Sequence, residues 1–539
     1  MLRQLLRHLL RRGAAAVSPV DQARAALVAQ RWRSALDLAL QAERESPGNA
    51  DALEVGVAAA DRLDDFREVG AALERAVRRD PASAVLNEML GTALRRSGDP
   101  QAALRFLDRA VELDAQRAGA WNSLGIARMQ LGNRAGAATC FRRVLELQPE
   151  RAEALCNLGI LRADAGEFEE SETCLRRALQ LDPGLVSAWA TLSLVLYGMG
   201  RHAAAEEVVR DARRRHPHDP TLEFHESQYL LARADWAAGW DAFEKRLQLG
   251  EVRSPVRLQR WDGSARAGAR IFVYGEQGLG DQIMFASCIP DLMATGATVT
   301  LAPDGRLVPL MARSFAGVRV LDLGAAARDP DALRQQHDCE VALGSLPFHF
   351  RRAAGDFPAR PRYLRADPAR VADWRRRLDA LGPGLKVGVS WRGGTLLTRR
   401  SLRCIEAPEL AGLLQTPGIV PVSVQYGEVA DDLQALRKAS GRDVTHWPEA
   451  LADYDETAAL VCALDLVVSV CTSVIHLAGA LGQEAWVLVP ASPEWRYLRA
   501  GDALPWYPRV RLVRQESLGN WTGPLNEVTG ELRRRASGM

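Results

Sequence analysis

The sequence lacks the cysteine patterns of zinc-binding and disulfide-rich proteins. Its eight cysteines form no C-x-x-C pair and show no zinc-finger spacing. In a chain of 539 residues, scattered cysteines predict reduced, mostly buried thiols and favour a cytoplasmic protein. No cluster of histidines and aspartates with the spacing of a metal site stands out either, so we expect no bound metal and no other cofactor.

Long apolar runs and a strong net charge are also missing. No run of 18 or more apolar residues occurs, so no transmembrane helix is expected. The net charge is only +2, which predicts no general attraction to nucleic acid. Three of the 69 basic residues are lysines. Arginine suits bidentate contacts to phosphate, although a GC-rich coding sequence produces the same bias.

Residues 1–15 combine leucine and arginine in a helical pattern, with the leucines on one face and the arginines on the other. The pattern contains no sustained apolar stretch of the kind found in signal peptides. A basic amphipathic helix can rest weakly on an anionic membrane surface, here through residues 1–12. Amphipathic helices more often cover a neighbouring domain, and we favour that interpretation.

Residues 16–250 repeat with a period of 34. Glycines and small residues keep this register, and the clearest unit reads AWNSLGIARMQLGNRAGAATCFRRVLELQP. Prolines recur at multiples of the period, at Pro47, Pro81, Pro149, Pro183 and Pro217. This pattern predicts tetratricopeptide repeats, each a pair of helices that a proline ends. We expect about six repeats and a divergent seventh pair, which together form a superhelix whose groove binds a protein or peptide partner.

The second half changes from helical periodicity to strands that alternate with helices. A turn-rich linker, 251–268, precedes two such series, at 269–381 and 382–539. Alternation of this kind predicts two parallel sheets built from βαβ units. Ligands of such sheets bind beyond the carboxyl ends of the strands. We therefore expect the site in a cleft between the two sheet domains.

Four segments carry a family resemblance: EQGLGDQIMFA, SVCTSVIHLAGALG, SPEWRY and PWYP. Together they resemble bacterial tetratricopeptide-repeat glycosyltransferases, whose catalytic half is similar to the heptosyltransferases of lipopolysaccharide synthesis (glycosyltransferase family 9). The resemblance extends over almost the whole chain. It implies an all-α tetratricopeptide superhelix followed by an α/β GT-B fold of two Rossmann-like domains. The acceptor would bind on the first of these domains and the nucleotide sugar on the second.

The EQGLGD segment provides the candidate base. Gly278 and Gly280 allow a tight turn after the strand. Asp281 stands where a helix begins, so the residue pattern alone is equally compatible with a helix cap. The resemblance implies that Asp281 acts as general base on the acceptor hydroxyl, and Glu276 is the second candidate.

The segment SWRGGTLLTRRSLR places several arginines just beyond a strand. Arg392, Arg399 and Arg400, together with Arg403, could hold the diphosphate of a donor, or they could form a solvated basic loop. Gln425 and Tyr426 end another strand, and the resemblance implies that they lie near the nucleotide base. Trp495, Arg496 and Trp506 could stack on a ligand, but we favour a packing role against the C-terminal helix.

The segment SVCTSVIHLAGALG has two interpretations. Cys471 and His476 could form a thiol nucleophile and its base. Alternatively, the segment is a strand followed by a helix whose first amides bind an anion, with Thr472, Ser473 and His476 near the donor phosphate. We favour the second interpretation. The heptosyltransferases carry an acidic residue at the position that matches Cys471, so this departure indicates either a donor other than ADP-heptose or a loss of activity.

The sequence therefore predicts an inverting, metal-independent glycosyltransferase that acts on a protein acceptor. The alternative is a non-catalytic tetratricopeptide adaptor with a degenerate transferase domain. A cysteine hydrolase is the weakest interpretation, because no third group to orient the base stands out.

Overall fold

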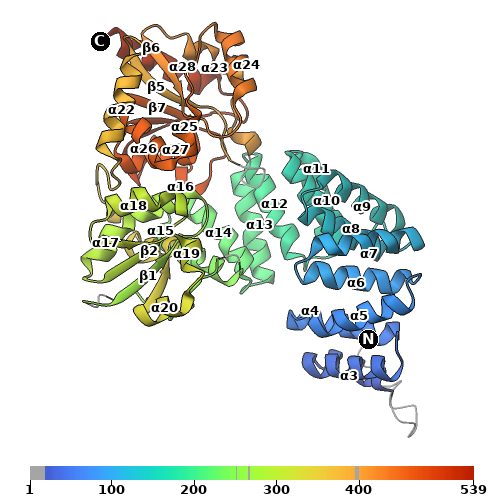
Figure 1. Cartoon of the computed structure of the whole chain (residues 1–539). Coiled ribbons are helices and arrows are strands. Elements are labelled where there is room, and N and C mark those ends of the chain that lie inside the picture. The colour runs from blue at the N-terminus through green and yellow to red at the C-terminus, as the bar shows by residue number, and fades with distance from the viewer. Residues whose placement is uncertain (1–17, 251, 265–266, 395–399, 539) are drawn as a thin grey trace. The chain divides into compact units, whose positions relative to one another are not determined.

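A computed structural model describes residues 18–250, 252–264, 267–394 and 400–538 (Figure 1). The amphipathic segment 1–12 lies outside these residues. The chain forms two compact units: the first ends at Thr191 and the second begins at Leu192, apart from the short segment Asp164–Phe168, which belongs to the second. In the described part of the chain, no helix has the length and apolar character needed to span a membrane.

The first unit consists of antiparallel helix pairs (Figure 1). The first helices of successive pairs begin at residues 50, 84, 118 and 152, a constant interval of 34. This interval confirms the predicted tetratricopeptide period. The helices are α2 Pro19–Val28, α3 Trp32–Glu45, α4 Ala50–Leu63, α5 Arg67–Arg79, α6 Ala84–Arg96, α7 Pro100–Leu113, α8 Ala118–Gln130, α9 Arg134–Leu147, α10 Ala152–Ala165 and α11 Phe168–Leu181.

Close packing within each pair explains why glycine recurs in the period. A Cβ atom on Gly91 would lie 2.5 Å from Leu107 Cγ, and one on Gly125 would lie 2.7 Å from Phe141 Cε1. Only a residue without a side chain allows this approach. The turn glycines have a different reason, because Gly98 and Gly132 have φ values of 89° and 78°, a left-handed conformation that favours glycine.

Four further helices continue the period into the second unit. These are α12 Val186–Gly198, α13 His202–Arg215, α14 Pro220–Ala232 and α15 Trp236–Phe243, followed by the short 3-10 helix η1 Glu244–Gln248. From Leu192 onward they pack with the α/β region. The compact units thus divide near residue 191, whereas the period alone places all helices up to residue 250 in one repeat domain.

The first sheet is parallel and has the strand order β3-β2-β1-β4. Its strands are β1 Arg270–Tyr274, β2 Thr298–Ala302, β3 Arg319–Val320 and β4 Cys339–Ala342. The sequence predicts one helix from Gln282 with Pro290 near its end. Instead, α16 Leu279–Phe285 stops early, and Pro290 lies in the first turn of α17 Ile289–Ala294, where proline needs no hydrogen-bond donor.

The second sheet has the order β6-β5-β7-β8-β10-β9, and only β9 is antiparallel. Burial on both faces explains its apolar strands. Its helix α27 Ser473–Leu481 directly follows β7. The strands are β5 Leu385–Ser390, β6 Ile419–Ser423, β7 Leu466–Val470, β8 Ala485–Val489, β9 Ala503–Leu504 and β10 Tyr507–Arg514, and the C-terminal helix is α28 Thr522–Ser537.

An aromatic cluster joins α15 to the α/β region. The ring centroid of Trp240 lies 5.5 Å from that of Trp495 and 6.2 Å from that of Trp506, and Phe285 adjoins both tryptophans. The packing role that we expect for Trp495 and Trp506 therefore holds, but their aromatic partners lie on α15, on α16 and at Phe357 rather than on the C-terminal helix.

Candidate functional site

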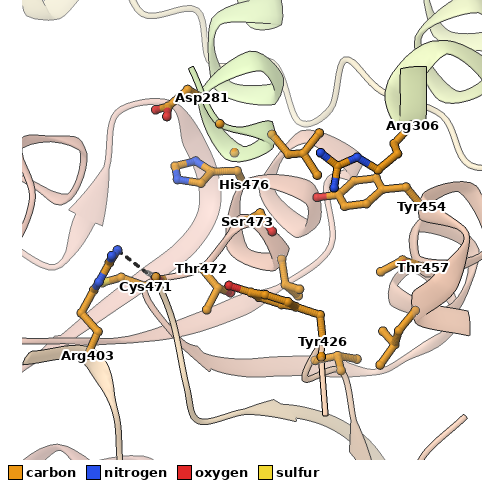
Figure 2. A pocket seen from close by; sticks show the side chains of 18 of the residues that line it. Asp281, Arg306, Arg403, Tyr426, Tyr454, Thr457, Cys471, Thr472, Ser473 and His476 are labelled. Atoms are coloured by element: carbon orange, nitrogen blue, oxygen red, sulfur yellow. Dashed lines mark hydrogen bonds between the residues drawn. The ribbon is translucent and has the colours of Figure 1, made fainter. Parts of the chain in front are cut away.

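A cavity of about 620 Å³ lies beyond the carboxyl ends of strands from both sheets (Figure 2). The first sheet domain contributes the loop after β1 and Arg306 after β2; the second contributes the turns after β6, β7 and β8. This is the place where open α/β sheets bind ligands. The predicted site residues that line it are Gly278, Gly280, Asp281, Tyr426, Thr472, Ser473 and His476.

Asp281 lies in the first turn of α16 but does not cap it. Gly278 occupies the N-cap position, and the Asp281 carboxylate accepts a hydrogen bond from the Arg496 Nε. Burial opposes the charged form of Arg496, but the Asp281 and Glu494 carboxylates outweigh this effect and raise the pKa of Arg496. The helix-cap interpretation therefore does not hold, and Asp281 is a cavity carboxylate paired with an arginine.

Glu276 faces away from the cavity. Arg246 Nε donates to its two carboxylate oxygens at 3.0 and 3.2 Å, and the backbone N–H of Gly344 donates to Oε1 at 3.1 Å. Glu276 is only 7% exposed and is not a lining residue. These contacts favour a structural role in which Glu276 fixes the loop to η1, so Asp281 is the better candidate for a base.

The turn between β7 and α27 leaves the start of the helix without a side-chain cap. Thr472 is the N-cap residue, and its side chain makes no capping hydrogen bond; its Oγ1 lies 3.1 Å from Ser469 Oγ instead. The first amides of a helix that lack capping partners can bind a phosphate. Gly393 lets the chain after β5 pass close to this turn, because a Cβ there would lie 2.6 Å from the Cys471 carbonyl oxygen.

Cys471 is a buried thiol rather than a nucleophile. It is 1% exposed, and burial raises its pKa to about 12. A nucleophilic cysteine requires a lowered pKa. Burial and the raised pKa therefore disfavour a nucleophilic Cys471, and anion binding at this turn stays a prediction.

His476 is enclosed by two tyrosines. Its Nδ1 lies 3.1 Å from Tyr507 Oη, and its Nε2 lies 3.4 Å from Tyr497 Oη. Burial lowers the pKa of His476 to about 3, so the imidazole is neutral at physiological pH. Because both ring nitrogens have tyrosine partners, His476 lines the cavity as a neutral group that holds α27 in position.

Among the described residues of the arginine segment after β5, Gly394 and Arg403 line the cavity. Arg403 Nη1 lies 3.3 Å from Glu494 Oε1 and donates to the Cys471 carbonyl oxygen at 3.4 Å (Figure 2). Arg392 instead pairs with Asp432 at 2.6 Å and does not line the cavity. Arg399 lies outside the described residues, as does the side chain of Arg400, so both stay predictions.

Gln425 and Tyr426 have different environments. The Gln425 side-chain oxygen accepts hydrogen bonds from the backbone N–H groups of Trp391 and Arg392 at 3.0 and 2.8 Å. Gln425 thus fixes the chain after β5 and is not among the cavity-lining residues. Tyr426 is 46% exposed, lines the cavity and presents an aromatic face to it (Figure 2).

Sequence reasoning missed Arg306 and Tyr454, which lie close together on one side of the cavity (Figure 2). Burial raises the pKa of Tyr454 to about 12. Arg306 follows β2 by four residues, so the rule that ligands bind beyond carboxyl strand ends could have identified it. No group of three or more metal-ligating side chains occurs in the part of the chain that the structure describes.

The comparisons with known families concern the repeats. Residues 87–215 match the family model of the middle TPR-like domain of cilia and flagella-associated protein 70. This match coincides with the 34-residue helix pairs. The chain therefore contains tetratricopeptide repeats. The match covers only part of the chain and leaves both sheets outside it.

A curated relative matches over a longer stretch. Protein FlbA of Caulobacter vibrioides (strain ATCC 19089 / CIP 103742 / CB 15) is 34% identical over 330 residues, which are 58% of this tetratricopeptide-repeat chain and 55% of FlbA. The chain thus spans about half the length of the curated relative that it matches.

Several solved structures resemble part of the chain. PilW, a type IV pilus biogenesis factor, is 21% identical, with a TM-score of 0.35, over 39% of this chain and 98% of PilW. YrrB, described as a TPR protein with an unusual peptide-binding site, is 24% identical, with a TM-score of 0.26, over 34% of this chain and 95% of YrrB.

Proposed function

We propose that this protein transfers a sugar from a nucleotide-sugar donor to a protein acceptor, with inversion and without a metal ion. The observation that carries the proposal is the composition of the large cavity. The cavity is lined by a carboxylate, Asp281, by the N-terminus of α27 at Ser473, which has no side-chain cap, by Arg403 and by the exposed Tyr426. A glycosyl transfer needs these functions: a base, a diphosphate site and a surface for the nucleotide.

The reaction would proceed as a single displacement. Asp281 takes the proton of the acceptor hydroxyl as its oxygen forms a bond to the anomeric carbon. The bond between that carbon and the phosphate oxygen breaks on the opposite face, and the nucleoside diphosphate leaves with the electron pair. The first amides of α27 and the guanidinium of Arg403 stabilise the negative charge that develops on the leaving phosphate.

The repeats support a protein acceptor. Stacked helix pairs form extended concave surfaces that bind protein segments, and the first unit contains such pairs in regular succession. In this proposal the repeats select the acceptor protein and the α/β region performs the transfer.

One contact favours the alternative of a non-catalytic adaptor. Asp281 already accepts a hydrogen bond from Arg496, so it must share or release this bond to receive a proton. With Asp281 held in this ion pair, the cavity would bind a nucleotide sugar without turning it over, and the repeats would supply the whole function.

Measuring the turnover of nucleotide sugars by two aspartate variants distinguishes the transferase function from the adaptor function. We expect purified full-length protein to consume at least one member of a panel of nucleotide sugars. Asp281→Asn should reduce this turnover by about 10²–10⁴-fold, as expected for loss of a general base. The matched control is Asp338→Asn, because Asp338 is half exposed, pairs with Arg270 and lies outside the cavity.

Equal turnover by wild type and Asp281→Asn would remove the catalytic assignment. If the panel raises the melting temperature but is never consumed, the adaptor function is correct.

A further inference from the structure

A second cavity of about 240 Å³ lies beside the first and shares the lining residues Glu494 and Arg496 with it. It belongs entirely to the second compact unit. Its walls come from α12, α14, α15, the loop after β1 and the loop around η7 Trp495–Tyr497. Neither the donor nor the base assignment makes use of this cavity.

The loop that precedes α16 lines both cavities. Gln277 lines the second cavity and the next residue, Gly278, lines the first. Gln277 has a φ of 60°, an uncommon left-handed conformation for a residue other than glycine, and it is exposed. Arg496 lines both cavities, and its partner Asp281 lines the first. The pair thus lies where the two spaces adjoin.

The wall of the second cavity contains five aromatic residues, the charged pair Glu494 and Arg496, and two unpaired amides. The side-chain amides of Gln228 and Gln277 make no hydrogen bond to any residue that the structure describes, although Gln228 is half-buried. A carboxamide offers both a donor and an acceptor, as a peptide group does. The aromatic residues are Tyr197, Phe224, Tyr229, Phe243 and Trp495.

We propose that the second cavity binds the acceptor as an extended peptide. This inference rests on the proposed function. An apolar or aromatic side chain of the acceptor packs among the rings, and its peptide group pairs with Gln228 and Gln277. The serine or threonine hydroxyl next to it then reaches Asp281. The volume fits one large side chain, because small-molecule pockets begin at about 300 Å³.

Peptide binding to the full-length protein tests this assignment. An arrayed library of peptides with a central serine or threonine is screened by fluorescence polarisation. We expect the bound peptides to be enriched in phenylalanine, tyrosine or leucine beside the hydroxyl residue. Leu194→Trp fills the cavity and should weaken this binding about tenfold or more, since the apolar side chain loses its place.

Milder and control variants keep the test valid if Leu194→Trp fails to fold. Gln228→Ala removes one hydrogen bond and should weaken binding by about two- to tenfold. Gln248→Ala is the matched control, because Gln248 is exposed and lines neither cavity; its peptide affinity should equal that of wild type.

Two results would overturn the acceptor site: no peptide binds, or the bound peptides retain their affinity in both cavity variants. Failure of the proposed function looks different. In that case the peptides bind and respond to the variants as expected, but no nucleotide sugar is consumed in their presence; the cavity is then a peptide site of a non-catalytic protein.

Discussion

Glycine has the same role in the repeats and in the α/β region, but only the repeats show it in the sequence. Gly91 and Gly125 each lie under a large side chain of the paired helix, 34 residues apart. Gly280 lies in the same way under His476, where a Cβ would meet the ring at 2.9 Å, yet nothing in the sequence repeats it. A contact that recurs in every repeat produces a periodic pattern in the sequence, whereas a contact that occurs once produces no such pattern.

Charge pairs in the repeats and in the α/β region differ in how deeply they are buried. In the repeats, Arg117 Nε donates to Glu88 at 2.7 Å, and both side chains are partly exposed. In the α/β region, Arg246 and Glu276 are almost fully buried. Exposed pairs contribute little to stability, whereas a buried arginine that loses its partner is costly. Substitutions at matched positions in the two regions can therefore measure this difference.

The largest expected effect is that of Glu276→Gln. The substitution leaves Arg246 buried with only Glu244 as a charged partner, so we expect a loss of about 3 kcal/mol in the free energy of unfolding. Glu88→Gln in the repeats should cost about 1 kcal/mol or less. Urea unfolding of both variants measures the two values, and equal losses would remove the distinction between the pairs.

The same Glu276→Gln variant also tests which of the two carboxylates, Glu276 or Asp281, acts as the base. If Glu276→Gln is as stable as wild type and nevertheless loses all turnover, then Glu276 is the base and the structural role is wrong.

The second prediction concerns the pH dependence of stability. A buried neutral histidine, His476, lies beside the cavity, whereas residues 18–191 contain no histidine. Burial lowers the pKa of His476 in the folded protein from 6.5 to about 3. The unfolded chain therefore binds a proton below pH 6.5 that the folded chain does not. Stability is lost as the pH falls from 6.5 towards 3, by about 3 kcal/mol at pH 4.

His476→Gln tests the source of this loss. The variant keeps a polar group between Tyr497 and Tyr507 but cannot titrate. Urea unfolding at pH 8 and pH 4 should show a difference between the two pH values that is smaller by about 3 kcal/mol in the variant than in wild type. An identical pH dependence in both proteins would assign the acid sensitivity to other groups.

The sequence predicted the repeats well because their contacts are local. Gly125 and Phe141 are 16 residues apart, within one repeat, so composition and period together define the helix pair. The alternation of strands and helices also predicted where Asp281 and Ser473 would meet a cavity. The chain's path beyond each strand could be inferred, because parallel strands present their carboxyl ends at one edge.

The partners of the site residues could not be predicted. Asp281 and Arg496 are 215 positions apart, and no local pattern connects them. Glu276 and Asp281 are five positions apart at the start of α16, yet one side chain faces Arg246 and the other the cavity. Arg392 and Arg403 belong to one basic segment, but only Arg403 reaches the cavity. Side-chain direction within a loop depends on distant packing, and periodicity contains no information about it.

The smallest expected effects come from two glycine substitutions, which test the opening comparison directly. Gly125→Ala places a methyl group 2.7 Å from Phe141, and Gly280→Ala places one 2.9 Å from His476. Both should lose about 1–3 kcal/mol through overpacking. Gly70→Ala is the control, because a Cβ at Gly70 meets nothing within 4 Å and alanine favours the helix interior.

The two variants should lose similar amounts of stability. They should differ in how much a nucleotide-sugar donor raises their melting temperature. Gly280→Ala displaces His476 and the start of α27, so a nucleotide sugar should raise its melting temperature less than that of wild type. Gly125→Ala repacks one repeat and should keep the full shift. If Gly280→Ala keeps the full shift as well, the close contact between α16 and α27 is only a packing contact, as in the repeats, and contributes nothing to the donor site.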